Sequence, residues 1–283
     1  MKSWSGSIKG AATRRAVRRS GGAGALCLGA LMLASAPLWA QGRPAAGAAA
    51  APAKPAGARA HAPFDLSGYW TSVITQNWRY RMIVPGPGEY ADIPINRKAK
   101  QMADAWRAAA QIAAGKQCEA YGAAVIMRLP EHLHISWQDA DVLRVDTDAG
   151  MQTRLLHFKA AATGTPMAPS QQGYSQAKWV TAGAGGFFAA QPAPNAPRFG
   201  SLQVITDHML PGLLRKNGVP YGSGTKMTEW WDLRVEPTGD QWLSINTTVE
   251  DPEYLMGPFI YDSVFQKEPD GSKWAPSACS LTS

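Results

Sequence analysis

The chain has 283 residues with 28 basic and 21 acidic side chains, which gives a formal net charge of +7. The first 61 residues hold nine of the bases and none of the acids, so residues 62–283 carry 19 bases against 21 acids, a net charge of −2. Because no broad basic surface remains outside the N-terminal segment, these residues are not expected to bind nucleic acid.

The first 40 residues have the pattern of an export signal. Basic residues between Lys2 and Arg19 precede the apolar run ALCLGALMLASAPLWA, which is too short and too rich in glycine for a membrane span. We expect cleavage after Ala40 and a periplasmic or secreted protein with no stable membrane insertion. The arginine pairs in TRRAVRR leave general secretion and twin-arginine export both open.

Residues 41–61, QGRPAAGAAAAPAKPAGARAH, are almost all Ala, Pro and Gly. Such a segment has few side chains with which to bury a core, so it is predicted to be a disordered tether. The remaining residues, 62–283, suit a single β-rich domain.

The first half of this domain begins with strand-like residues and then turns helical. DLSGYWTSVITQNWRYRMIV is rich in β-branched and aromatic residues, and PGPGEYADIP, which follows it, is typical of a loop. Small and apolar residues then recur at helical spacing over residues 97–115, with Asn96 as the cap and Gly115 as the end. This is the one helix that the pattern predicts.

After Cys118 the chain alternates between strand-like runs and short turns. Turns such as QDAD, TDAG and EPTGD are typical of an antiparallel meander, and residues 181–200 form a long loop. The predicted fold is all-β and mainly antiparallel, a lipocalin-like closed barrel or a sandwich with one helix inserted, and closure is favoured. The predicted strands are HLHISW, VLRVDT, MQTRLLHF, YSQAKWV, SLQVITDHM, KMTEWWDLRV, QWLSINTTVED and FIYDSVFQK.

Two cysteines, Cys118 and Cys279, follow the export signal. In an oxidising compartment two thiols in one domain usually pair, so we expect a disulfide between them. No C-x-x-C or zinc-type cluster is present.

The stretch EHLHISW places His132 and His134 on the same face of a strand, as a pair of metal ligands must lie. His157 and His208 are the histidines that could complete such a site with His134. Since H-x-H alone is too few ligands, no cofactor is predicted, and an ordinary strand histidine is favoured over a metal ligand or a catalytic group.

Five residues are the candidate catalytic groups: His134, His157, His208, Glu229 and Glu250. Glu229 lies between Met227 and Trp231 on an otherwise apolar face, which suits either a general acid or base or a carboxylate in a salt bridge. Parity within each strand allows all of them except His208 to share one side of the sheet, with His208 at the rim. A salt bridge from Glu229 to Arg154 or Arg144 is the favoured structural explanation.

The candidate ligand-binding residues are Trp231, Trp242, Asn246 and Arg154. Trp242, Asn246 and Glu250 share one face of their strand, and this face suits either a partly polar barrel interior or solvent. Aromatic residues that line a cavity are typical of sites for a flat apolar or sugar-like ligand. Separately, RKNGVPYGSG places two cations beside a glycine-rich loop that could hold an anion, although a plain connection between strands is favoured.

The order of several segments resembles a large group of secreted bacterial β-rich proteins of unknown function. These segments are CEAYGAAVIMRLPEHLHI, TRLLHF, QGYSQAKW, GVPYGSGTKMTEWW and TTVEDPEYLMGPF, over about residues 65–279. The group's Gly-His-Ser segment has Tyr174 in place of the histidine here, and no Glu-Gly-Asp follows Trp179. The resemblance implies an exported β-rich domain and no particular reaction. GYW is also similar to the Gly-x-Trp of lipocalins.

Two functions of different classes follow. The first is an exported barrel that binds a small amphipathic or aromatic molecule in an aromatic-lined cavity. The alternative is a non-hydrolytic acid–base enzyme, such as an isomerase, lyase or cyclase, that uses histidine and glutamate in the barrel. The sequence leaves open whether the protein is an enzyme, and a histidine and a glutamate within hydrogen-bond reach in an open pocket would favour the enzyme.

Overall fold

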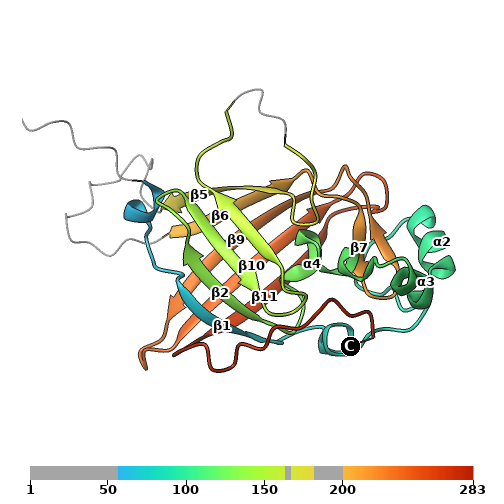
Figure 1. Ribbon diagram of the computed structural model, residues 1–283, viewed down its shortest axis with the longest axis horizontal. Helices are drawn as coiled ribbons and strands as arrows, with labels where there is room; N and C mark the ends of the chain where they lie inside the picture. Colours follow the sequence, from blue (N-terminus) through green and yellow to red (C-terminus); the bar gives the residue numbers. More distant parts are fainter. Residues whose placement is uncertain (1–56, 163–166, 182–199, 283) are drawn as a thin grey trace, which may run out of the picture. The chain divides into compact units, whose positions relative to one another are not determined.

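The computed structural model describes residues 57–162, 167–181 and 200–282. The predicted export signal, most of the tether and nearly all of the 181–200 loop lie outside the described residues. The described part is a nine-stranded closed barrel with a small capping region at one end (Figure 1), which confirms the predicted all-β barrel. Within the described residues, no helix is long and apolar enough to cross a membrane.

The barrel strands follow the predicted runs closely, but the second part of the first strand-like run, Trp78–Met82, is a helix and not a strand. Around the barrel their order is β1, β11, β10, β9, β6, β5, β4, β3 and β2, which pairs again with β1. Neighbours are antiparallel except β4 and β5, which are parallel over two residue pairs. The strands are β1 (Gly68–Val73), β2 (His132–Trp137), β3 (Val142–Thr147), β4 (Thr153–His157), β5 (Tyr174–Thr181), β6 (Gly200–Asp207), β9 (Lys226–Val235), β10 (Gln241–Glu250) and β11 (Phe259–Glu268).

Alternation along each strand divides the interior of the barrel from its outer surface. On β10 the side chains of Leu243, Ile245 and Val249 are fully buried, whereas Asn246 and Glu250 on the opposite face are exposed. Because successive side chains point to opposite sides of a strand, the apolar set faces inward. The polar face of this strand is therefore the outer surface and not a wet interior.

The capping region is built from short helices and one hairpin between β6 and β9. Figure 1 shows α4 and β7 beside one end of the barrel, with α2 and α3 farther out. The hydroxyl of Tyr261 on β11 donates to the carbonyl of Ala124 in α4 at 2.9 Å, which joins the cap to the barrel. The capping elements are α1 (Trp78–Met82), α2 (Arg97–Ala105), α3 (Ala108–Ala113), η2 (Gln117–Tyr121), α4 (Ala123–Ile126), β7 (Gly212–Arg215) and β8 (Val219–Tyr221).

The predicted helix over residues 97–115 is two helices, α2 and α3. The side chain of Asn96 caps α2 by accepting from the Ala99 amide at 2.9 Å, as predicted. The chain leaves the helical conformation at Trp106, whose ring packs on Gly218 in the β7–β8 turn. A Cβ at Gly218 would lie 2.4 Å from the Trp106 Cβ, so the glycine makes room for the tryptophan. The break therefore reflects tertiary packing that the local pattern does not reveal.

The end of the predicted tether is ordered on the barrel. The 3-10 helix η1 (Ala58–His61) is held by the amide of Ala58, which donates to Asp141 at 2.9 Å. The indole of Trp179 donates to the Ala58 carbonyl at 3.0 Å. The prediction of disorder up to residue 61 is thus wrong for residues 57–61, because side chains of the barrel supply the partners that this segment lacks by itself.

Candidate functional site

The structure does not bring the predicted histidines and glutamates together. His134 lies between Leu133 and Ile135, which are fully buried, so it points to the outer surface. There it stacks on Tyr69 with 4.4 Å between ring centroids. The prediction that His134, His157, Glu229 and Glu250 share one side of the sheet is therefore wrong.

The other histidines also lie outside the barrel core. His157 stacks on Tyr174 at 4.9 Å between ring centroids, and partial burial lowers the pKa of its imidazole. His208 is partly exposed and its Nδ1 lies 2.6 Å from Asp207 at the end of β6. Glu250 is exposed at the end of β10. Since none of these groups meets Glu229, the geometry that the acid–base alternative required is not found in the described part of the chain.

Glu229 is the one candidate acid inside the barrel, and it is bound to Arg154. Both side chains have 0% exposure, and Arg154 donates to the two carboxylate oxygens at 2.7 and 3.1 Å. The hydroxyls of Ser175 and Thr206 lie 3.5 and 3.4 Å from the Arg154 guanidinium. The favoured salt bridge is confirmed. A carboxylate engaged in this way stabilises the barrel and is not placed for proton transfer to a histidine.

Of the four predicted ligand-binding residues, two lie inside the barrel and two on its outer surface. Trp231 is fully buried in the barrel interior, together with Trp70 and Phe265. Trp242 and Asn246 lie on the outer surface, where Asn246 donates to Asp262 at 2.7 Å. The interior aromatics therefore pack as a core, and the predicted interior site is not assembled from these four residues.

His132 has a structural partner. Its Nδ1 lies 2.6 Å from the carboxylate of Asp148, and the same carboxylate accepts from the amide of Ala275 at 3.3 Å. Asp148 thus ties the C-terminal segment to the start of β2. No group of three or more His, Cys, Asp or Glu side chains in the described ranges is placed to hold a metal ion.

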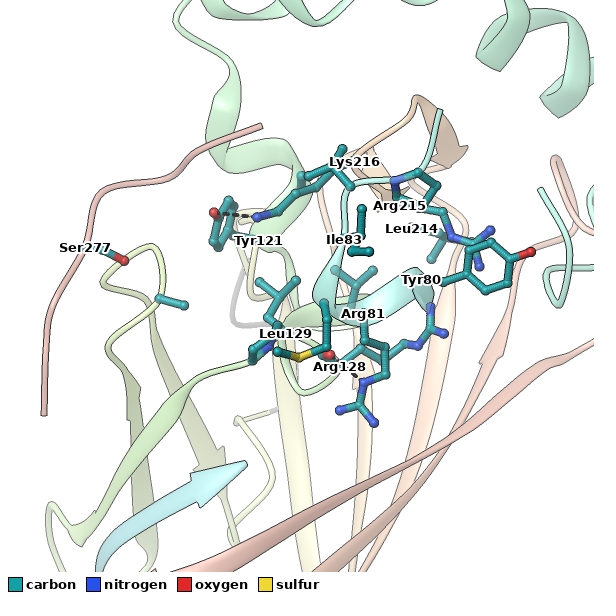
Figure 2. Close-up of a pocket in the computed structure, with 17 residues that line it drawn as sticks. Tyr80, Arg81, Ile83, Tyr121, Arg128, Leu129, Leu214, Arg215, Lys216 and Ser277 are labelled. Atoms are coloured by element: carbon teal, nitrogen blue, oxygen red, sulfur yellow. Dashed lines mark hydrogen bonds between the residues drawn. The ribbon is translucent and has the colours of Figure 1, made fainter. Parts of the chain in front are cut away.

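A cavity of about 320 Å³ lies at the capped end of the barrel (Figure 2). Its wall combines the chain from α1 onward, the segment around α4 and the outer end of β7. The first and the last of these parts are more than a hundred residues apart in the sequence. The lining residues are Tyr80, Arg81, Met82, Ile83, Val84, Pro85, Ala120, Tyr121, Val125, Arg128, Leu129, Pro130, Ala149, Leu214, Arg215, Lys216 and Ser277.

Four cations and no acid are among these lining residues. Arg128 donates to the carboxylate of Asp92 at 3.1 Å, and Arg215 donates to the other oxygen of the same carboxylate. One carboxylate outside the wall therefore serves two guanidinium groups. The cluster keeps an excess of positive charge, which attracts an anion more strongly in a partly buried site than in water.

Arg81, unlike Arg128 and Arg215, has no ion-pair partner among the described residues. Its side chain donates to the carbonyls of Arg128 at 2.8 Å and Asp262 at 3.4 Å, and the residue is 8% exposed. The Nη2 atom is buried and has no hydrogen-bond partner among the described residues. Burial, and then the charge of Arg128, lowers the pKa of the Arg81 guanidinium to about 10. A buried guanidinium without a counter-charge is costly, and a negative charge placed near it lowers that cost.

Glu131 lies near this cluster without neutralising it. The residue is buried, and neither carboxyl oxygen has a hydrogen-bond partner in the part of the chain that the structure describes. Burial raises the pKa of the Glu131 carboxyl well above its ordinary value, Asp148 adds to the rise, and Arg154 and Arg81 oppose it. The environment of the carboxyl thus favours its neutral form.

The remaining wall of the cavity is apolar and aromatic. The guanidinium of Arg215 lies over the ring of Tyr80 at 4.6 Å. Lys216 lies 4.7 Å from the Tyr121 ring centroid and donates to the Tyr121 hydroxyl at 3.0 Å, the contact that is dashed in Figure 2. With Ile83 and Leu129 beside these rings, the cavity offers both charge and an apolar surface.

The sequence indicated half of this site. Arg215 and Lys216 are the two cations of RKNGVPYGSG, and the segment forms the connection between β7 and β8, as favoured; that these cations hold an anion stays a prediction. Arg81 and Arg128 were not predicted as site residues, because the local sequences RYRM and IMRLP contain no binding motif. Comparison of the chain with models of known families, with curated proteins and with solved structures finds no match.

Proposed function

We propose that the protein is an exported β-barrel that binds a small amphipathic anion in the cavity at its capped end. The observation that carries the proposal is the guanidinium of Arg81, whose buried Nη2 has no hydrogen-bond partner among the described residues, in a wall with three other cations. An anionic group of the ligand would supply the missing negative charge and accept hydrogen bonds from cations of the wall. Charge-assisted hydrogen bonds of this kind are shorter and stronger than neutral ones.

The size and lining of the cavity support a ligand with an apolar part. Small-molecule sites have volumes of about 300–1,000 Å³ and are mostly apolar with a few placed polar groups. At about 320 Å³ this cavity lies at the lower end of that range. The rings of Tyr80 and Tyr121 and the side chains of Ile83 and Leu129 would cover a short chain or a ring system.

The disulfide between Cys118 and Cys279 supports the export part of the proposal. Stable disulfides form in oxidising compartments such as the periplasm or the exterior of the cell. The bond also holds the segment before α4 to the C-terminal segment, and both segments contribute residues to the cavity wall.

Titration with anilinonaphthalene sulfonate, an aromatic anion whose fluorescence rises in apolar surroundings, tests this function. Its uncharged analogue N-phenylnaphthylamine, which lacks the sulfonate, is the matched probe. We expect saturable binding of the sulfonate and at least about tenfold weaker binding of the analogue, because one hydrogen bond to a charged group contributes roughly 1.5–3 kcal/mol.

Variants locate the binding. Arg81→Gln should remove most of the preference for the sulfonate, and Arg81→Lys should restore part of it. Arg234→Gln, which changes an exposed arginine on β9, is the control and should leave both titrations unchanged. If Arg81→Gln does not fold, Lys216→Gln serves in its place. Equal affinity for the two probes in the natural protein would contradict the proposal.

A further inference from the structure

Exposed apolar side chains gather at one lip of the cavity. Trp78 is 64% exposed, Met82 56% and Ile83 49%. Trp78 and Met82 are four residues apart on α1 and so lie on the same side of this helix. Single exposed apolar residues are ordinary, but three within six residues beside a cavity form a patch that marks an interaction surface.

Positive charge accompanies this patch. Arg79 on α1 is half-exposed, and the cavity wall directly behind the lip contains Arg81, Arg128, Arg215 and Lys216. Two carboxylates at this end are engaged with arginines, Glu89 with Arg79 and Asp92 with Arg128 and Arg215. By contrast, residues 62–283 as a whole carry a net charge of −2. The charge of the molecule is therefore unevenly distributed, and its positive part lies at the apolar lip.

We propose that α1 and its following residue dock on an anionic lipid surface, with Trp78, Met82 and Ile83 inserted among the headgroups. This inference rests on the proposed function and names the source of the ligand, an anionic amphipath taken from or delivered to the lipid. Tryptophan favours the boundary between water and lipid because its ring is apolar and its N–H is polar. Apolar insertion and attraction to anionic headgroups together give reversible surface binding.

Met82 and Ile83 link the docking surface to the cavity. Each is about half-exposed and each also lines the cavity, so a single layer of side chains separates the cavity from the outer surface at this point. A lipid surface would cover the exposed side of this layer while its inner side contacts the ligand. A rigid protein partner would cover the patch equally well but would not supply the amphipathic anion that the cavity suits.

Co-sedimentation of the mature chain with lipid vesicles tests the docking. The vesicles are pure phosphatidylcholine in one arm and phosphatidylcholine mixed with phosphatidylglycerol in the other. We expect binding to the anionic vesicles and little to the neutral ones. Trp78→Ser should weaken the binding about tenfold or more, since a large apolar side chain no longer leaves water.

Val235→Ser is the matched control. Val235 is also exposed, and it lies at the far end of β9 from Met227, which pairs with Val249 beside the cap. This variant should bind anionic vesicles like the natural protein. Trp78→Ser should retain binding of anilinonaphthalene sulfonate, because Trp78 does not line the cavity.

The outcomes separate the two proposals. Absence of vesicle binding with normal sulfonate binding would overturn the docking and leave the proposed function intact. Vesicle binding without sulfonate binding would overturn the proposed function and leave the docking intact. Equal binding to both vesicle types, or an unchanged Trp78→Ser variant, would also overturn the docking. So would a dimer in sedimentation velocity that Trp78→Ser dissociates, which would assign the patch to a second copy of the chain.

Discussion

Arg154 and Glu229 form a fully buried ion pair inside the barrel. Both side chains are inaccessible to solvent, and two hydrogen bonds join them. Removal of one partner from such a pair leaves an uncompensated buried charge, which is far more costly than the pair is stabilising. The role of Glu229 is therefore to keep Arg154 neutralised within the core.

This role predicts that Glu229→Gln destabilises the fold without acting at the cavity. We expect the free energy of unfolding to fall by about 3–5 kcal/mol, the usual cost of breaking a buried ion pair. Chemical denaturation measures it, with Glu250→Gln, an exposed change on the neighbouring strand, as the control. Joint replacement of Arg154 by Met and Glu229 by Leu should recover most of the loss. A Glu229→Gln protein of natural stability would contradict this role.

Parity along the strands predicted which residues share a face, but not how faces match between strands. Glu229 was correctly grouped with Met227 and Trp231 on one face of β9. The assignment of His134 to the inner side failed because Leu133 and Ile135 take that side. On each strand the face with the more apolar side chains is the one that is buried, and on β2 this face contains neither histidine. The sequence did contain a signal for the inner pair. A basic and an acidic side chain each lie on an otherwise apolar face of a strand, and such charges must pair when they are buried.

At the scale of elements, the disulfide and the β7–β8 hairpin hold the cavity wall. Cys118 and Cys279 are bonded, with 5.2 Å between their Cα atoms, as the sequence predicted from compartment and number of thiols. The bond joins η2, which precedes α4, to the C-terminal segment that runs past Tyr121. The hydroxyl of Tyr121 accepts from the amide of Ser280 and donates to its carbonyl, both at 2.9 Å.

Replacement of both cysteines by alanine should lower the free energy of unfolding by about 4–5 kcal/mol, from the loop-closure entropy of a loop of this length, less any strain in the native state. The sequence separation is 161 residues. Thermal and denaturant unfolding of the oxidised protein and the double variant provide the measurement. Replacement of both residues together avoids a free thiol. A difference below about 1 kcal/mol would show that the C-terminal segment is held by its hydrogen bonds alone.

The strands were predictable as elements, but the parallel pairing of β4 with β5 and the break in the predicted helix were not. Alternating runs bounded by polar turns marked every barrel strand, because each strand has one apolar face. The parallel pairing of β4 with β5 was not foreseen, since a meander reading assumes that neighbours in sequence are antiparallel. The break at Trp106 depends on Gly218, more than a hundred residues away, and the helical pattern over 97–115 carries no trace of that contact.

At the scale of the molecule, the barrel is the support and its capped end is the candidate site. Closure places the apolar faces inside, and the aromatic residues that suggested an interior ligand are used for packing there. The cavity instead forms where α1, α4 and β7 meet over the barrel end. Its arginines come from three distant segments, so their excess of charge exists only in the folded chain. A local motif can indicate at most one wall of such a site.

The central claim is that this cavity receives the charged group of an amphipathic anion. A crystal structure of the protein with anilinonaphthalene sulfonate tests it most directly. We expect a sulfonate oxygen within about 3.2 Å of a side-chain nitrogen of one of the four cations in the wall, with the rings against Tyr80, Ile83 and Leu129. A probe bound elsewhere, such as between Trp70 and Trp231 in the barrel or in the surface groove beside His157, with the cavity holding only water, would contradict it.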